Sequence, residues 1–169
     1  MTRRQALAAT SAALAATNAA PAATNAAPAA TGAVAPAPPA AGAEAADAAV
    51  LRMLDDFAAA WNRHDVEGLM ACMTPDGVFE ASAGPEVAGA RHVGAAAVRK
   101  AYAAVFATYP DARWNQPRHF VAGDRAVTEW TFTGTTKDGT RVEVNGCDVF
   151  TLRGGKIALK NSYRKQRTA

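Results

Sequence analysis

The sequence predicts a single α+β domain in which helices largely precede an antiparallel sheet. Between residues 50 and 109, large apolar residues recur every three or four positions, which is typical of amphipathic helices. From residue 113 onward they alternate with polar residues, which is typical of strands. Every tryptophan, tyrosine and phenylalanine follows residue 49. About 120 residues therefore remain to form a core, which is an ordinary size for one domain.

Residues 1–46 are rich in alanine and proline and are expected to lie outside this core. Arg3 and Arg4 precede a weakly apolar stretch, so residues 1–30, which include the repeat AATNAAP, resemble a twin-arginine signal peptide. Residues 31–46 are expected to form a flexible linker because proline interrupts helices. Residues 47–169 form the predicted domain. The expected location is the periplasm or the exterior; the alternative is a cytoplasmic protein with two accidental arginines.

Three helices are predicted. Asp65 is expected to cap the short second helix, and Pro110 follows the third, which covers about 94–108. The residues expected on the inner faces of the first and third helices are Val50, Leu54, Phe57, Trp61, Val98, Tyr102, Val105 and Tyr109.

Five strands are predicted, one of them, VFEASA, before the third helix. The other four, within residues 113–163, follow one another through short turns such as KDG and RGGK, and are expected to form an antiparallel meander. A strongly curved sheet that holds the helices in its hollow would bury the apolar faces of both.

Asp148 interrupts an apolar strand face, because it shares the parity of Val142, Val144, Phe150 and Leu152. If this face lines a pocket, burial should raise the pKa of the carboxyl, and a neutral acid can donate a hydrogen bond to a ligand. The alternatives are a structural pair with Asn161, Tyr163 or an arginine, or exposure to solvent.

The motifs from WNRHD to GGKI resemble the NTF2-like superfamily, in particular SnoaL-like polyketide cyclases and ketosteroid isomerase-like proteins. The segments that carry the resemblance are FAAAWNRHDVEGLMACMTPDGVFEASAG, HVGAAAVRKAYAAVF and GDRAVTEWTFTGTTKDGTRVEVNGCDVFTLRGGKI, which together span about residues 47–163. The resemblance implies a cone, with three N-terminal helices packed in a curved antiparallel sheet around an apolar pocket. It also implies a homodimer.

The same resemblance places only one of the three ketosteroid isomerase site residues on a residue of the same type in this sequence. The acid that donates to the oxyanion matches Asp148, but the general base falls on Ala81 and the oxyanion tyrosine on Phe57. Because alanine cannot abstract a proton, ordinary steroid isomerisation is not expected. The predicted pocket residues are Phe57, Trp61, Phe79, Ala81, Tyr102, Trp130, Val144, Asn161 and Tyr163.

Other candidates have simpler explanations. Glu80 alternates away from Phe79 and is expected to pair with an arginine. His92 and His119 have no carboxylate nearby in sequence that would indicate catalysis, and His64, beside Asp65, is expected to be exposed. Cys72 and Cys147 are expected to be free thiols, with a disulfide as the alternative. No metal, nucleotide or redox motif is present, so no cofactor and no nucleic-acid partner is expected.

Two function classes remain open on the sequence. One is an isomerase or cyclase that uses Asp148 on a small apolar molecule. The other is a non-catalytic ligand-binding or dimeric structural module, since this fold hosts both kinds of protein.

Overall fold

The computed structural model describes residues 41–167 of the 169-residue chain. The predicted signal peptide at 1–30 lies outside the described residues. The elements are α1 (Ala41–Arg63), α2 (Val66–Ala71), β1 (Met73–Glu80), β2 (Arg91–Val93), α3 (Ala95–Thr108), β3 (Arg113–Ala122), β4 (Arg125–Thr135), β5 (Arg141–Arg153) and β6 (Lys156–Arg164).

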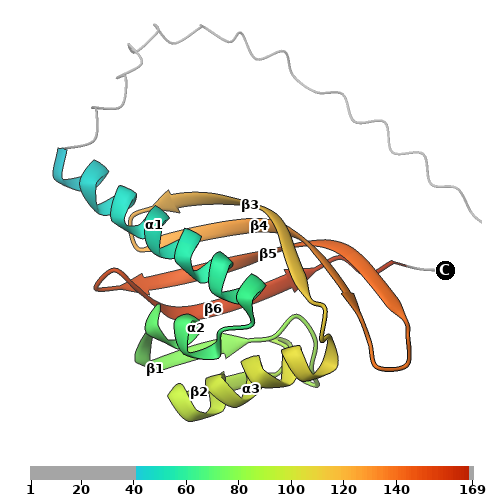
Figure 1. The fold of residues 1–169 in the computed structure, drawn as a ribbon. Helices are drawn as coiled ribbons and strands as arrows, with labels where there is room; N and C mark the ends of the chain where they lie inside the picture. The colour runs from blue at the N-terminus through green and yellow to red at the C-terminus, as the bar shows by residue number, and fades with distance from the viewer. Residues whose placement is uncertain (1–40, 168–169) are drawn as a thin grey trace, which may run out of the picture. The chain divides into compact units, whose positions relative to one another are not determined.

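The strands form one six-stranded sheet in the order β2-β1-β6-β5-β4-β3 (Figure 1). The predicted meander is present, since β3 to β6 pair antiparallel in chain order. The sheet is mixed rather than wholly antiparallel, because β1 pairs in parallel with β6. The short strand β2, which pairs with the end of β1, was not predicted, because three residues are too few to show an alternating pattern.

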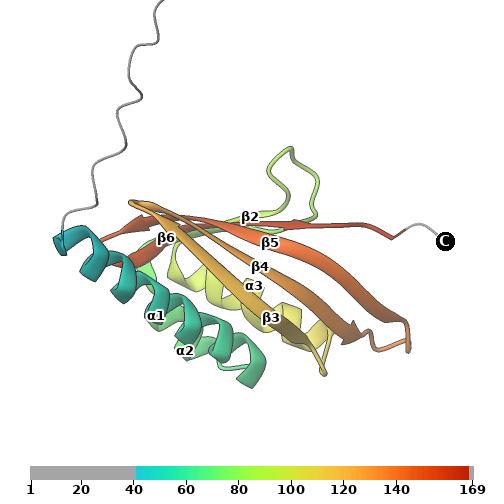
Figure 2. The ribbon, with the colours of Figure 1, turned by 90° about the horizontal axis from the view of Figure 1, so that it is seen from above.

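The helices lie together on one side of the sheet, and the loop between β1 and β2 projects from the other side (Figure 2). α1 packs against β3, and α3 packs against β1 and β2. The helix α1 begins at Ala41, within the predicted linker 31–46. No proline occurs between residues 40 and 74, and alanine is the best helix former, so residues 41–46 extend the helix.

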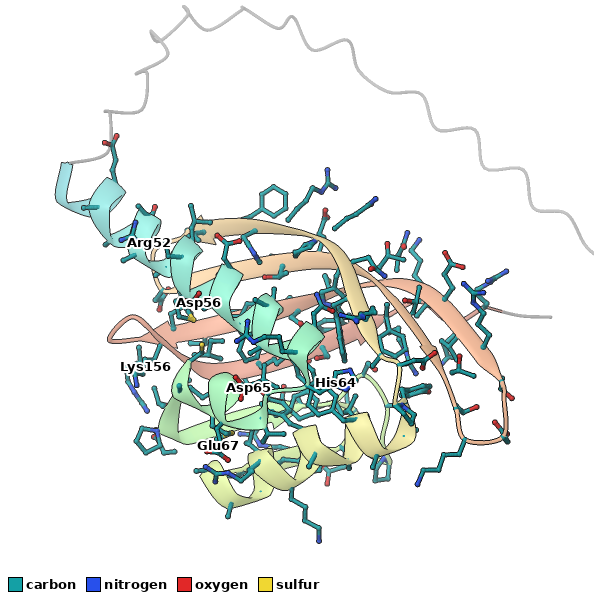
Figure 3. The ribbon with its side chains drawn as sticks, viewed as in Figure 1. Arg52, Asp56, His64, Asp65, Glu67 and Lys156 are labelled. Atoms are coloured by element: carbon teal, nitrogen blue, oxygen red, sulfur yellow. The ribbon has the colours of Figure 1, made fainter. Side chains whose placement is uncertain are left out.

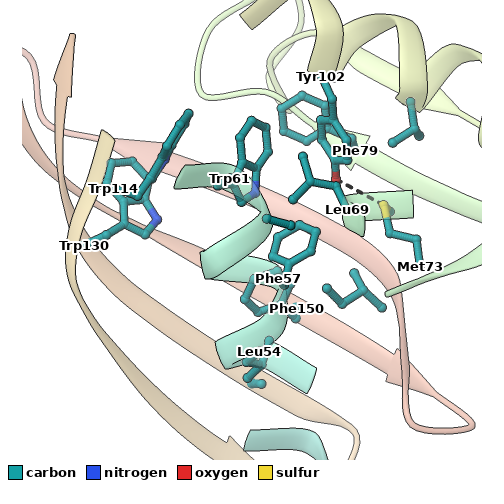
Figure 4. Close-up of a cluster of buried hydrophobic side chains, with 14 of the residues drawn as sticks. Leu54, Phe57, Trp61, Leu69, Met73, Phe79, Tyr102, Trp114, Trp130 and Phe150 are labelled. Atoms are coloured by element: carbon teal, nitrogen blue, oxygen red, sulfur yellow. Dashed lines mark hydrogen bonds between the residues drawn. The ribbon is translucent and has the colours of Figure 1, made fainter. Parts of the chain in front are cut away.

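The apolar residues predicted on the helix faces form the core. The side chains of Leu54, Phe57 and Trp61 from α1 are almost fully buried, as is Tyr102 from α3. Figure 4 shows these rings packed against Phe150 of the sheet, and the Tyr102 hydroxyl donates to the Met73 sulfur at 3.1 Å. Phe57 and Tyr102 are thus core residues that lie beneath the site.

The turn after α1 sets the direction of α2. His64 has a φ of 56°, in the left-handed region, and its ring stacks on Phe106 at 4.4 Å. Asp65 caps α2 as predicted, because its Oδ1 accepts from Gly68 N at 2.8 Å. Figure 3 shows both side chains at this junction, with Glu67 on α2.

Candidate functional site

An inner pocket opens between the helices and the concave face of the sheet. Its volume is about 290 Å³, at the small end of ligand pockets. The lining is mostly aromatic and aliphatic, and its residues are Trp61, Phe79, Ala81, Ser82, His92, Ala101, Ala104, Val105, Thr108, Tyr109, Trp114, Trp130, Phe132, Lys160, Ser162 and Arg164. A pocket of this volume suits a single-ring or bicyclic molecule.

A buried polar cluster lies beside this pocket, centred on Asp148. The Asp148 carboxylate accepts hydrogen bonds from Lys160 Nζ at 2.7 Å, Ser162 Oγ at 2.6 Å and Trp130 Nε1 at 3.0 Å. The Lys160 and Asp148 side chains are 5% and 6% exposed. Three donors aimed at one carboxyl group match an ionised carboxylate, because a protonated acid would have to donate one hydrogen itself.

Lys160 also contacts the aromatic wall of the pocket. Its Nζ lies 4.8 Å from the ring centroid of Phe79 and 5.4 Å from that of Trp61, both within the range of cation–π attraction. Burial lowers the pKa of Lys160, and the attraction and hydrogen bond of Asp148 oppose that shift. A lysine whose charge is disfavoured therefore faces the pocket.

The position of Lys160 results from a bulge in β6. Leu152 pairs with Ile157, but the next residue of β5, Thr151, pairs with Leu159, so Ala158 is an extra residue. Beyond this bulge, each β6 side chain points to the opposite face of the sheet from the one that regular alternation from Ile157 would give it. Ser162 pairs with Asp148, and Lys160 and Ser162 point inward in place of their neighbours.

Gly146 makes room for the indole that contacts Asp148. Trp130 pairs with Gly146 across β4 and β5, and a Cβ at residue 146 would lie 2.3 Å from the Trp130 ring. The ring can lie over the glycine only because that atom is missing. This holds Trp130 Nε1 against the carboxylate.

Two buried hydrogen-bond donors at the pocket are left with unused capacity. Trp61 Nε1 is fully buried and has no partner among the described residues. An ammonium has three hydrogens, and the described contacts of Lys160 Nζ, to Asp148 and Ser162, use two of them. Because a buried donor without a partner costs free energy, an acceptor atom from a ligand would be stabilised here.

The family model of the SnoaL-like domain matches residues 50–160. The chain belongs to the SnoaL-like domain family. No curated protein matches it. The fold class predicted from the sequence is confirmed by this match and by the solved structures.

Solved structures share the fold of this SnoaL-like domain. A polyketide cyclase-like protein of Xanthomonas campestris is 19% identical, with a TM-score of 0.62 over 70% of this chain and 91% of that one. An NTF2-like protein of Mesorhizobium loti is 28% identical, with a TM-score of 0.59 over 70% and 93%. A Catenulispora acidiphila protein with a ketosteroid isomerase-like fold, solved with trimethylamine, is 22% identical, with a TM-score of 0.59 over 66% and 83%.

The SnoaL-like domain brings only part of the predicted pocket set together. Trp61, Phe79, Ala81 and Trp130 line the inner pocket. Val144 is buried in the core with Phe57 and Tyr102, and these three are not among the lining residues.

Asn161 and Tyr163 lie on the opposite face of the sheet, so their predicted facing was wrong. They line an outer hollow of about 870 Å³, and Tyr163 is 54% exposed. The bulge at Ala158 is the reason, since it reverses the alternation from which the prediction was made. The outer hollow is larger than the inner pocket, but it holds charged and exposed side chains such as Arg118 and Glu129.

Asp148 has a buried partner, as one alternative proposed, but the partner is Lys160 and not Asn161, Tyr163 or an arginine. Lys160 and Ser162 are the site residues that sequence reasoning missed. The useful signal was a basic residue two positions before a serine in the strand that pairs with Asp148.

Glu80 and His119 each have a charged or polar partner in the structure. Glu80 is buried and pairs with Arg91, as expected. The His119 side chain is 7% exposed, with Nδ1 2.7 Å from Thr128 Oγ1 and Nε2 3.2 Å from a carboxylate oxygen of Asp55, a partner from α1 that is distant in sequence.

His92 and the two cysteines are the other residues considered from the sequence. His92 lines the pocket and stacks on Phe79 at 5.7 Å. Cys72 and Cys147 are free thiols, and burial is the main cause that raises the pKa of each. Within residues 41–167, no group of three His, Cys, Asp or Glu side chains can hold a metal ion, and no helix there is long and apolar enough to cross a membrane.

Proposed function

We propose that the inner pocket binds a small, flat, apolar molecule that carries an acceptor oxygen, such as a carbonyl, phenolate or carboxylate. The observation that carries this proposal is the pair of buried donors at an aromatic wall, Trp61 Nε1 and the remaining hydrogen of Lys160. The rings supply apolar contact, and the donors favour a ligand whose oxygen replaces the hydrogen bonds lost on leaving water.

The reaction class that fits this arrangement is isomerisation or cyclisation through an enolate. Lys160 would polarise the ligand carbonyl and stabilise the negative charge that develops on its oxygen, because a preorganised cation in a dry site acts most strongly on new charge. Asp148 holds Lys160 in place, so we assign it a positioning role instead of the direct acid role expected from the sequence.

A base is also needed to remove the proton. Ala81 lines the pocket where the isomerases carry their base and has no basic group. His92 also lines the pocket, and an imidazole is the commonest general base, so His92 is the proposed proton acceptor. A non-catalytic binding protein would lose ligand affinity if Lys160 or Trp61 were replaced, but not if His92 were replaced.

A paired ligand screen tests the proposal. Thermal unfolding is followed with naphthaldehyde, naphthoic acid and naphthalene, which share a ring system and differ in oxygen. A ligand at about a hundred times its Kd adds roughly 2.7 kcal/mol to the free energy of unfolding. We expect the two oxygen-bearing compounds to stabilise the protein more than naphthalene.

The variant Trp61→Phe sharpens the screen. It removes the unpartnered N–H and should weaken the oxygen-bearing ligands by about five-fold, the equivalent of one ordinary hydrogen bond of roughly 1 kcal/mol. The matched control is Trp114→Phe, which alters another pocket ring whose nitrogen is not a buried, unpartnered atom. Equal binding of naphthalene and naphthoic acid would contradict the proposal.

We also propose that the outer sheet face pairs two copies of the chain. Tyr163 and Val87 are exposed on the rim of the outer hollow, among polar neighbours such as Asn145 and Arg118. A mixed surface of this kind suits a moderate, hydrated interface. Light scattering should give a dimer mass for the wild type and a lower mass for Tyr163→Glu; a monomeric wild type would exclude the pairing.

A further inference from the structure

Lys160 differs from every other lysine of the chain in its surroundings. Lys100, Lys137, Lys156 and Lys165 are exposed, and Figure 3 shows Lys156 near the β5–β6 turn. Lys160 alone places its amine at an aromatic pocket, with the residue 4% exposed. An amine in a dry pocket is a nucleophile once it loses its proton.

We propose that Lys160 forms a reversible imine with small aromatic aldehydes or ketones that enter the inner pocket. This inference rests on the proposed function, because the same pocket and the same acceptor oxygen are involved. It adds that carbonyl compounds are the substrate class and that the polarising contact becomes a covalent bond.

The contacts around Lys160 supply the proton path that the step needs. The Nζ donates to Asp148 Oδ1 at 2.7 Å and to Ser162 Oγ at 2.6 Å, and Ser162 Oγ donates to the same carboxylate oxygen at 2.6 Å. Asp148 is thus the acceptor for the ammonium proton. Burial lowers the pKa of Lys160, which favours the neutral amine.

The aromatic wall suits both the substrate and the product. The rings of Phe79 and Trp61 lie 4.8 Å and 5.4 Å from Nζ, so a planar ligand that packs on them brings its carbonyl carbon to the amine. Trp61, whose buried Nε1 has no partner in the described residues, lines the same pocket. Exclusion of water slows hydrolysis of the imine.

The step balances in atoms and charge. Asp148 takes one proton from the ammonium, and the freed lone pair of Nζ forms the C–N bond as the carbonyl π pair moves to oxygen. The oxygen receives the proton held by Asp148, and the nitrogen of this carbinolamine gives Asp148 a second proton. That proton allows the hydroxyl to leave as water while the nitrogen lone pair forms C=N. The nitrogen keeps its third hydrogen, so this product is already the iminium, which pairs with the regenerated carboxylate. Ammonium plus carbonyl thus becomes iminium plus water.

Reductive trapping on the full chain tests the proposal. The protein is incubated with naphthaldehyde at neutral pH, reduced with cyanoborohydride and mapped by peptide mass spectrometry. We expect one naphthylmethyl group, located on Lys160. The label should be lost in Lys160→Arg, which keeps a charge beside Asp148 but has no amine, and should be unchanged in Lys156→Arg, which alters an exposed lysine.

A competition measurement on the wild type keeps the test valid if Lys160→Arg does not fold. Naphthoic acid fills the pocket but forms no imine, so it should suppress the label on Lys160 and leave any background label on the exposed Lys156 unchanged. Labelling confined to exposed lysines and insensitive to naphthoic acid would overturn the imine. If naphthoic acid still binds in that case, the proposed function stands; if no naphthyl compound binds, the proposed function fails as well.

Discussion

Replacing Lys160 with methionine should destabilise the domain strongly, because it leaves Asp148 buried without its cation. The two side chains are 5% and 6% exposed, and Nζ lies 2.7 Å from the carboxylate. Removing one partner of a buried pair costs about 3–5 kcal/mol. For a domain of this size that corresponds to a fall in Tm of roughly 10–20 °C.

The double variant Lys160→Met/Asp148→Asn distinguishes this cause from lost packing. It removes both charges, and the amide oxygen of asparagine can still accept from Trp130 or Ser162. Because the uncompensated charge is gone, we expect the double variant to cost at least about 2 kcal/mol less than the sum of the two single variants.

Urea unfolding of the wild type, the two single variants and the double variant gives these free energies. The control is Arg118→Met, which breaks a pair of similar length, 2.6 Å, whose side chains are 73% and 47% exposed. That change should cost at most about 1 kcal/mol. Strict additivity at Lys160 and Asp148, or a Lys160→Met cost as small as the control, would refute the argument.

Four further predictions concern the Trp130 ring, the α2 cap, the titration of Lys160 and the predicted signal peptide. Gly146→Val should displace the Trp130 ring and cost about 1–3 kcal/mol, measurable by thermal unfolding; an unchanged Tm would mean that the ring does not need the space. Asp65→Ala should cost about 1 kcal/mol through loss of the α2 cap, while exposed Asp56→Ala should be nearly neutral in the same assay. The folded state lowers the pKa of Lys160 below 10.5, so the unfolded chain binds more protons between these two pKa values. The free energy of unfolding of the wild type relative to Lys160→Met should therefore rise with pH across that interval in urea titrations, and a decrease would contradict the assigned direction. Replacing Arg3 and Arg4 with lysines should block export, as seen by cell fractionation, if residues 1–30 act as a twin-arginine signal.

Much of the fold was predictable because it depends on periodic patterns. Leu54, Phe57 and Trp61 recur at helical spacing and are buried in the core. Val144 and Phe150 alternate in β5 and are also buried. The parallel pairing of β1 with β6 was not predictable in this way, because it joins segments that are far apart in the chain.

The sequence predicted Asp148 as a site residue but not Lys160 or Ser162, and the bulge residue Ala158 is the reason. Counting back from the Gly-Gly turn without a bulge pairs Asp148 with Asn161; the extra residue Ala158 moves the pairing to Ser162. A one-residue slip exchanges the two faces of a strand. Lys160 therefore points into the protein, where alternation had placed Leu159 and Asn161.

The most direct measurement of the central claim is the indole N–H spectrum of the protein during titration with naphthoic acid. The three tryptophans give separate signals, which Trp61→Phe and Trp114→Phe assign. We predict that the Trp61 signal moves downfield as its unpartnered N–H gains an acceptor, while the signal of Trp130, already bonded to Asp148, shifts less. A ligand that binds without moving the Trp61 signal would contradict the account.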